Sequence, residues 1–286
     1  EEFTKAKNLE FPRSVRIGHD KILECGELCD DLMFGKIGAI ITGDSTYRAA
    51  GRMVEELIND RGYEVSVIRA GNATLDTVDA TYKECKEIKA KFVFAVGGGS
   101  KIDIGKLVAA KLKKPFVSVP TSVAHDGITS DRASIRTDEQ RVSMQAVTPM
   151  AIVADSAIIQ QAPYRTLASG CADVLSNLVA VKDWQYAAMK TGEPVSSSGL
   201  VISQFAAENI RANAEFIRSG KEESVWSVMR AIVASGVSMC IAKSSRPTSG
   251  SEHMFSHALD QYWGAPALHG EQCGIGTIMM MKLHYG

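Results

Sequence analysis

The chain has no excess of charge of either sign and no long apolar runs. Its 32 lysines and arginines almost balance 33 acidic residues, which gives a formal net charge of −1 at pH 7. Such a balance argues against nucleic acid as the main partner. No apolar run reaches the ~18 residues of a membrane span, and the first residues, Glu1 to Lys5, do not form a signal peptide. We therefore predict a cytoplasmic protein without an integral membrane segment.

The sequence also lacks cysteine pairs at the spacing of a metal-binding motif. The six cysteines are scattered along the chain without CxxC spacing. Cys25 and Cys29 lie four apart on a predicted helix, which favours buried free thiols over zinc ligands or disulfides. With 286 residues, of which 45% are hydrophobic and 23% charged, the chain has the composition of an ordinary globular protein.

The spacing of the apolar residues changes once along the chain. Up to about Asp155, short apolar runs alternate with helical segments, and after Pro163 almost everything has a period of 3.6. The predicted strands are 14–18, 37–42, 64–69, 92–96, 116–120, 132–135, 142–147 and 150–154, with a hairpin turn at 137–140. The predicted helices of the second half are 164–190, 195–218, 222–243, 251–263 and 271 onward. This pattern predicts an α/β N-terminal nucleotide-binding domain, residues 1–156, plus an all-α C-terminal domain, residues 157–286.

A glycine-rich turn, Gly97-Gly98-Gly99-Ser100, connects a predicted strand to a predicted helix. Glycines let the backbone approach an anion closely, and the free N–H groups at the start of the helix can then bind phosphates. Ser100 can cap that helix. The turn is not the six-residue dinucleotide fingerprint, so an ordinary glycine-rich turn is an equal alternative. Asp44, at the end of an earlier strand, could bind an adenosine ribose hydroxyl or could cap the next helix.

A carboxylate and two imidazoles form a candidate metal site. Asp173 lies on a mostly apolar predicted helix, where an unpaired carboxylate is costly to bury, so it needs a cation or hydrogen-bond donors. His253 and His257 share a helix face, and His269 lies 16 residues after His253 in a predicted loop. Asp173, His253 and His269 are an accepted ligand set for a catalytic metal. Because no local ligand motif is present, hydrogen-bonded structural histidines stay an alternative.

Four stretches carry a resemblance to a known family: 94–103 (FAVGGGSKID), 120–130 (PTSVAHDGITS), 155–173 and 246–257 (RPTSGSEHMFSH). They resemble sn-glycerol-1-phosphate dehydrogenase, an archaeal family, within the wider group of glycerol dehydrogenase, dehydroquinate synthase and iron-containing alcohol dehydrogenases. The resemblance covers nearly the whole chain, and the last stretch is its most specific part. It implies a dehydroquinate synthase-like fold, and we expect the family's C-terminal helical tail to be missing from this chain.

The resemblance also implies site residues. Asp173, His253 and His269 would hold a divalent metal, usually Zn²⁺, with Ni²⁺ or Fe²⁺ as alternatives. NAD(H) or NADP(H) would be bound by Asp44, Gly97, Gly98, Gly99, Ser100, Asp103, Thr121, Ser122, Thr129 and Ser130. Asp126 would line the substrate pocket, and His257 would act in proton transfer or be a hydrogen-bonded core histidine.

The implied reaction is the reduction of dihydroxyacetone phosphate to sn-glycerol 1-phosphate, the backbone of archaeal ether lipids. The metal would stabilise the developing alkoxide as a Lewis acid, and either a water of the site or a relay through His257 would supply the proton. A substrate phosphate needs cationic donors. We predict that Arg132 or Arg246 binds it, together with His125, although each arginine could instead be an ordinary surface or helix-end charge.

Three other functions fit parts of this pattern. A glycerol dehydrogenase needs no phosphate site, and a dehydroquinate synthase needs a denser set of basic residues. A catalytically silent nucleotide-binding regulatory protein would bind the cofactor without turnover. We expect this protein to be a homo-oligomer.

Overall fold

The computed structural model describes residues 10–137, 141–264 and 267–286. Its N-terminal part is built on a six-stranded parallel sheet with the order β1-β8-β5-β4-β2-β3. The strands are β1 (Ser14–Gly18), β2 (Ile37–Thr42), β3 (Glu64–Arg69), β4 (Phe92–Gly97), β5 (Phe116–Pro120) and β8 (Ala151–Asp155). Every residue of β4, β5 and β8 is buried, as expected for parallel strands that are covered on both faces.

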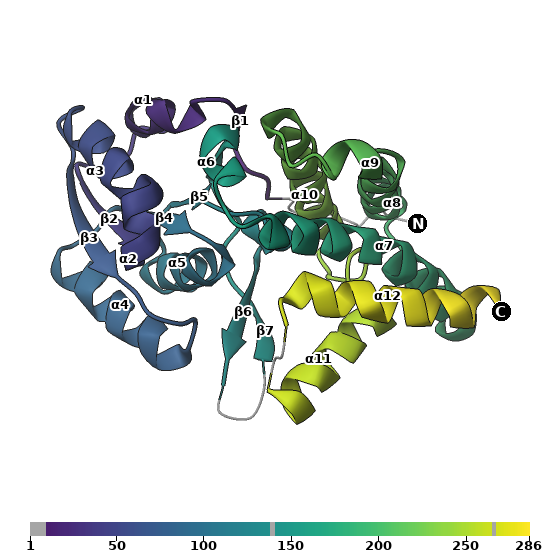
Figure 1. The fold of residues 1–286 in the computed structure, drawn as a ribbon. Coiled ribbons are helices and arrows are strands. Elements are labelled where there is room, and N and C mark those ends of the chain that lie inside the picture. Colours follow the sequence, from purple (N-terminus) through teal and green to yellow (C-terminus); the bar gives the residue numbers. More distant parts are fainter. Residues whose placement is uncertain (1–9, 138–140, 265–266) are drawn as a thin grey trace, which may run out of the picture.

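Helices cover both faces of this sheet (Figure 1). They are η1 (Lys21–Glu24), α1 (Cys25–Asp31), α2 (Asp44–Thr46), η2 (Tyr47–Gly51), α3 (Arg52–Asn59), α4 (Leu75–Glu87), α5 (Gly99–Leu112) and α6 (Ser156–Gln160). One core cluster holds residues of α1 and α3, such as Leu28 and Val54. The other holds residues of α4 and α5, such as Val78 and Ile102, and continues into the C-terminal helices through Val174 and Ile232. The C-terminal part therefore packs on the same side as α5.

A two-stranded antiparallel hairpin, which precedes β8 in the sequence, lies where the two parts meet. β6 (Arg132–Arg136) pairs with β7 (Arg141–Gln145), and the hairpin lies between the sheet and α11 in Figure 1. The predicted turn at 137–140 lies mostly outside the described residues. The short 3-10 helix η3 (Asp126–Ile128) immediately precedes this hairpin and contacts α10, α7 and α5. These contacts position the segment between Asp126 and Arg132 at the junction of the two parts.

The C-terminal part is helical. It contains α7 (Tyr164–Thr191), α8 (Ser197–Ala212), α9 (Ala214–Ile217), α10 (Glu222–Ala242), α11 (Ser251–Trp263) and α12 (His269–Tyr285). The predicted fold class is thus confirmed. One prediction was wrong in detail, because the helix expected at 195–218 is two helices that meet at Asn213, whose side chain bonds the carbonyl of Asn209.

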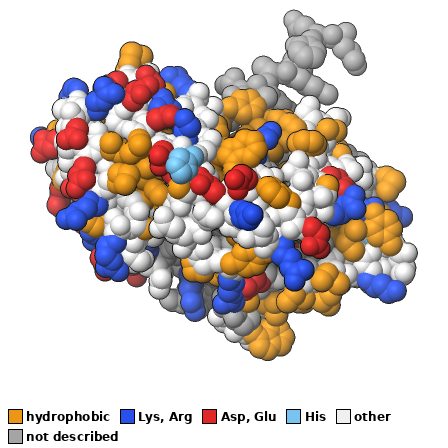
Figure 2. Space-filling view, turned by 45° about the horizontal axis from the view of Figure 1, so that its top comes forward, with side chains coloured by type: hydrophobic (Ala, Val, Ile, Leu, Met, Phe, Trp, Pro, Cys, Tyr) orange, Lys and Arg blue, Asp and Glu red, His pale blue; other side chains and the backbone are white. Residues whose placement is uncertain are grey.

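Helix α10 is long and apolar enough to cross a membrane by length and composition, the only such helix in the described part of the chain. However, 56% of its most apolar window is buried. Val228 and Ile232 pack in the core. Its apolarity is therefore that of a core helix. On the molecular face drawn in Figure 2, charged side chains of both signs are interspersed, so this face offers no uniformly basic surface for nucleic acid.

Candidate active site

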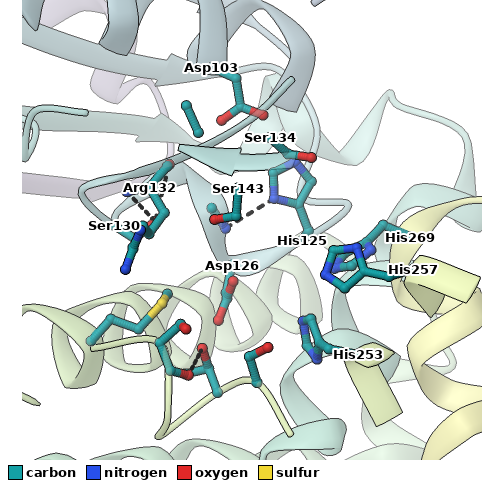
Figure 3. Close-up of a pocket in the computed structure, with 16 residues that line it drawn as sticks. Asp103, His125, Asp126, Ser130, Arg132, Ser134, Ser143, His253, His257 and His269 are labelled. Atoms are coloured by element: carbon teal, nitrogen blue, oxygen red, sulfur yellow. Dashed lines mark hydrogen bonds between the residues drawn. The ribbon is translucent and has the colours of Figure 1, made fainter. Parts of the chain in front are cut away.

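A cavity of about 230 Å³ lies where the sheet, the hairpin and the C-terminal helices meet. Figure 3 shows the side chains that line it, drawn from both parts of the chain. The lining includes Asp103, His125, Asp126, Ser130, Arg132, His253, His257 and His269. Residues far apart in the sequence thus share one space.

The glycine turn at the end of β4 is too crowded for side chains. A Cβ atom on Gly97 would lie 2.7 Å from Lys101 Cγ, and one on Gly99 would lie 1.8 Å from His125 Nε2. The cap of α5 is Gly98, in an extended conformation, so the prediction that Ser100 caps this helix was wrong. Gly98 and Gly99 are half-buried and Ser100 is exposed, and the free N–H groups at the start of a helix can bind an anion.

Asp44 is the first residue of α2, and the helix cap is the preceding residue, Gly43. The alternative that Asp44 caps the helix was therefore wrong. Its carboxylate is 85% exposed and lies 4.0 Å from the Arg69 guanidinium. Arg69 is held in place because it lies 3.5 Å over the Tyr47 ring and donates a hydrogen bond to the Gly43 carbonyl. Asp44 and Arg69 therefore lie side by side at the sheet edge, one acidic and one basic.

Of the other predicted cofactor residues, two line the cavity and three lie beside the glycine turn or are buried nearby. Asp103 and Ser130 line the cavity. The Thr121 N–H donates to the Gly97 carbonyl, which joins β5 to the glycine turn. Ser122 Oγ would lie 3.0 Å from a Cβ on Gly98, and Thr129 is fully buried.

Asp173, His253 and His269 come together from three helices. Asp173 is on α7 and His253 is on α11. His269 is the first residue of α12, so the prediction that it lies in a loop was wrong. Asp173 Oδ1 lies 3.8 Å from His253 Nε2 and 3.6 Å from His269 Nε2. It is buried and has no hydrogen-bond partner among the described residues. Burial raises the pKa of Asp173 to about 7. A divalent cation between these three groups would satisfy the orphaned oxygen, so the donor set fits a metal.

Neighbouring residues orient both imidazoles. His253 Nδ1 lies 2.7 Å from Glu252 Oε1, an acceptor, so Nδ1 carries the hydrogen. His269 Nδ1 lies 3.1 Å from Ser256 Oγ, which itself donates to Gln272 Oε1, so this Nδ1 also carries the hydrogen. In both rings Nε2 is therefore the nitrogen that faces Asp173 and is available to a metal. Such outer partners are typical of metal-binding histidines.

Asp126 lies beside this centre. Its backbone N–H donates to Asp173 Oδ2 at 2.9 Å, and its carboxylate accepts a hydrogen bond from Ser235 Oγ at 2.8 Å. Asn177 in turn donates to Ser235 Oγ. Burial raises the pKa of the Asp126 carboxyl.

Lys106, on α5, is fully buried close to Asp126. Its ammonium donates to the carbonyls of Gly127 and Arg132 and reaches Ser130 Oγ at 3.5 Å. Burial lowers the pKa of this lysine. Lys106 thus connects α5 through hydrogen bonds to both ends of the segment 127–132, which leads into β6.

Two of the three residues predicted for the substrate phosphate line the cavity. Arg132 and His125 are among the lining residues, and the Gly127 N–H donates to His125 Nδ1. Arg246 is not among them, and its Nε and Nη2 donate hydrogen bonds to the Glu193 carboxylate, at 2.8 and 2.6 Å. His257 lines the cavity 6.5 Å from the His269 ring. Partial burial lowers its pKa.

Three residues of the site were missed from the sequence. Glu252 and Lys106 are charged residues that are fully buried, and Cys273 lies among the metal-ligand candidates. The spacing of Cys273, four residues after His269 in a helix, was the available signal. Neither Glu252 nor Lys106 has a sequence signal that separates it from a surface charge. The prediction of free buried thiols is confirmed for all six cysteines.

Comparisons with known proteins agree on one family. Residues 16–163 match the family model described as iron-containing alcohol dehydrogenase. A glycerol-1-phosphate dehydrogenase [NAD(P)+] from Thermoplasma acidophilum is 46% identical over 283 residues, which cover 99% of this chain and 80% of that protein. One from Methanoregula boonei is 46% identical and covers 99% of this chain and 78% of its own length.

Solved structures share the fold at low sequence identity. Glycerol dehydrogenase from Schizosaccharomyces pombe superposes with a TM-score of 0.84 at 20% identity, covering 99% of this chain and 74% of that chain. Sulfoacetaldehyde reductase from Bifidobacterium kashiwanohense, solved in complex with NAD+, has a TM-score of 0.79 at 18% identity, covering 98% and 77%. From the sequence relatives, the chain belongs to the glycerol-1-phosphate dehydrogenase family, within the iron-containing alcohol dehydrogenases.

Proposed function

We propose that this protein reduces dihydroxyacetone phosphate to sn-glycerol 1-phosphate with NADH or NADPH. The names of its relatives state a dehydrogenase that acts on glycerol 1-phosphate with NAD(P)+. Removal of a hydride from C2 and of the proton from its hydroxyl converts that alcohol to dihydroxyacetone phosphate. The reverse reaction would supply the glycerol backbone of archaeal ether lipids.

The observation that carries the proposal is the shared cavity. Asp103 and Ser130 on the dinucleotide side, the cation Arg132, and the imidazoles His253 and His269 all line it. A carbonyl substrate placed there would lie between a hydride donor and an electrophilic centre, with a cation available for its phosphate.

We assign the dinucleotide to a first domain, residues 1–156, and the metal and substrate chiefly to a second, residues 157–286. The pyrophosphate would bind the glycine turn at the start of α5, and Asp44 would bind the adenosine ribose. Thr121, Ser122 and Thr129 would lie along the nicotinamide. The glycines support this assignment, because a side chain on Gly97 or Gly99 would collide with Lys101 or His125, so the turn presents bare backbone.

We further propose that Asp173, His253 and His269 hold a divalent metal, with Zn²⁺ the expected ion. A bound divalent cation supplies Lewis-acid polarisation of the substrate carbonyl. Asp126 would orient the substrate hydroxyl through the carboxylate that Ser235 fixes. His257, at the side of the cavity, would move a proton between the site and solvent, and Arg132 would bind the phosphate. Cytoplasmic location and homo-oligomeric assembly stay predictions.

The test is an assay of NADH and NADPH oxidation with dihydroxyacetone phosphate and with dihydroxyacetone, followed by chiral analysis of the product. We expect a strong preference for the phosphorylated ketone and formation of the sn-1 enantiomer. Equal use of both ketones would indicate a glycerol dehydrogenase. Tight cofactor binding without turnover would indicate a regulatory protein.

A further inference from the structure

The outer edge of the parallel sheet places a cation next to the carboxylate assigned to the adenosine ribose. β3 is the edge strand, and its last residue, Arg69, pairs in register with Thr42, the last residue of β2 (Figure 1). Asp44 follows two positions later, at the start of α2. Open parallel sheets bind their ligands at the carboxyl ends of the strands. The ribose end of a dinucleotide would therefore meet Asp44 and Arg69 together.

The Arg69 side chain is fixed in place but keeps donors for a ligand. Its guanidinium carbon lies 3.5 Å over the centre of the Tyr47 ring, and Nη1 donates to the Gly43 carbonyl at 3.1 Å. The Tyr47 hydroxyl in turn donates to Glu55. Within the described part of the chain, the Gly43 carbonyl is the only hydrogen-bond acceptor of Arg69. Stacking covers a face of the guanidinium and leaves its N–H edge for an anion, and the side chain is 39% exposed.

Asp44 does not occupy this edge of the guanidinium. Its Oδ1 lies 4.0 Å from Arg69 Nε, which is longer than a hydrogen bond. The Asp44 side chain is 85% exposed, and an exposed ion pair of this kind contributes little to stability. The carboxylate can therefore turn away at small cost. NADH would use Asp44 as acceptor for its ribose hydroxyls, and NADPH would present its 2′-phosphate to Arg69.

A second cation, Lys101, lies close to Gly43. A Cβ on Gly43 would lie 2.9 Å from Lys101 Cε, and one on Gly97 would lie 2.7 Å from Lys101 Cγ. Lys101 Nζ donates to the Gly71 carbonyl, so this contact leaves the positive charge of the ammonium unneutralised. The side chain thus lies where β2, β3 and β4 end. Both Arg69 and Lys101 approach Gly43, the residue before Asp44, and their charges favour a phosphate there.

We propose that Arg69 binds the 2′-phosphate of NADPH and so enables this chain to use NADPH despite Asp44. This inference rests on the proposed function and deepens it, because it names the residue that decides between the two cofactors. The planar fork of an arginine can bind two phosphate oxygens at once. NADH has no phosphate at this position. Removal of Arg69 should therefore weaken the binding of NADPH and spare that of NADH.

The experiment measures the Kd of NADPH and of NADH by nicotinamide fluorescence in the wild type and in Arg69→Met, Arg69→Lys and Arg52→Met. Arg52 is the matched control, an exposed arginine at the start of α3 that lies 3.7 Å from Glu56. Arg69→Met should raise the Kd of NADPH about 10-fold or more, as expected for lost hydrogen bonds to a charged group, and change that of NADH far less. Arg69→Lys, which keeps the charge without the fork, should fall between, and Arg52→Met should match the wild type.

Competition with 2′,5′-ADP tests the phosphate without the nicotinamide. Its affinity should fall in Arg69→Met to about the same extent as that of NADPH. NADH binding by the same sample shows that the variant is folded. An equal change in the Kd of NADPH and NADH, or an unchanged affinity for 2′,5′-ADP, overturns the proposal.

An Asp44→Asn background separates direct contact from charge neutralisation. If Arg69 only neutralised Asp44, Arg69→Met would have no effect on NADPH once the carboxylate is gone. Direct contact predicts that the loss of NADPH affinity persists in the double variant, and its disappearance overturns the proposal. If the wild type binds neither cofactor, the proposed function itself fails. If both cofactors bind and their Kd ratio is unchanged in Arg69→Met, only this inference fails.

Discussion

Replacing Asp173 by asparagine should have opposite effects on the metal-free and the metal-bound protein. Burial raises the pKa of this carboxyl from 3.8 to about 7. At 1.36 kcal/mol per pKa unit, holding the carboxylate ionised in the metal-free fold costs up to about 4 kcal/mol of unfolding free energy. Asparagine keeps the shape without the charge. The metal-free variant should therefore be more stable than the metal-free wild type at pH 8, by up to this amount.

The pH dependence follows from the direction of the shift. Because the pKa of Asp173 is higher in the folded than in the unfolded chain, the destabilisation is absent below 3.8, grows with pH, and is complete above about 7. The stability difference between variant and wild type should be smaller at about pH 5 than at about pH 8. Urea denaturation in the presence of a chelator measures it at both pH values.

Zinc should reverse the order of stability. A ligand at 1,000 times its Kd stabilises the folded state by about 4.1 kcal/mol, so zinc above that concentration offsets the cost of the buried charge in the wild type, and the variant, which lacks the anionic ligand, should gain little of this. The activity of Asp173→Asn should fall by orders of magnitude.

His253→Ala and His269→Ala should also lose metal, and His257→Ala should keep it. Asp183→Asn is the control on the same helix, since that carboxylate bonds the Ser251 N–H and His284 instead of the cluster. Full zinc occupancy in Asp173→Asn would refute the ligand assignment, and a metal-free variant less stable than the wild type at pH 8 would refute the account of the buried charge.

Three further predictions concern the cavity and its edges. Arg132→Ala should narrow the preference for dihydroxyacetone phosphate over dihydroxyacetone by roughly 30-fold or more, because a charged hydrogen bond to phosphate contributes on the order of 2–4 kcal/mol. Arg246→Ala, which breaks an ion pair outside the cavity lining, is its control, and an unchanged preference in both variants would place the phosphate site elsewhere. Asp44→Gly should raise the kcat/KM ratio of NADPH to NADH, because it removes a charge that repels the 2′-phosphate and leaves Arg69 in place; an unchanged ratio would show that Asp44 does not face the ribose. Lys106→Met should lower the unfolding free energy by roughly 2–5 kcal/mol, because buried carbonyl acceptors lose their donor, and urea denaturation showing no loss would contradict this.

Local sequence patterns were sufficient for the elements of this fold. The strand predictions at 14–18, 37–42 and 64–69 coincide with β1, β2 and β3, and the helix prediction at 251–263 coincides with α11. These elements follow from apolar periodicity and turn residues, which act over a few positions. The glycine turn could be recognised for the same reason, since its strand, turn and helix are contiguous. Ser100 was assigned the wrong role because Gly98, two residues earlier, takes up the extended cap conformation.

Recognising the candidate site required both the residue types in the sequence and the tertiary structure. The residue types Asp173, His253 and His269 pointed to a metal, because a carboxylate and imidazoles are ligand groups wherever they occur. Only the tertiary structure shows that α7, α11 and α12 bring both imidazoles within 3.8 Å of the Asp173 carboxylate. It also decides the environment of Lys106 and Cys273, since burial and partners come from packing between distant segments. The spacing of residues within one segment cannot encode that packing. The close approach of α12 to α7 depends on Gly270 and Gly274, which face α7. The residues of α7 that they contact lie about a hundred positions earlier in the chain.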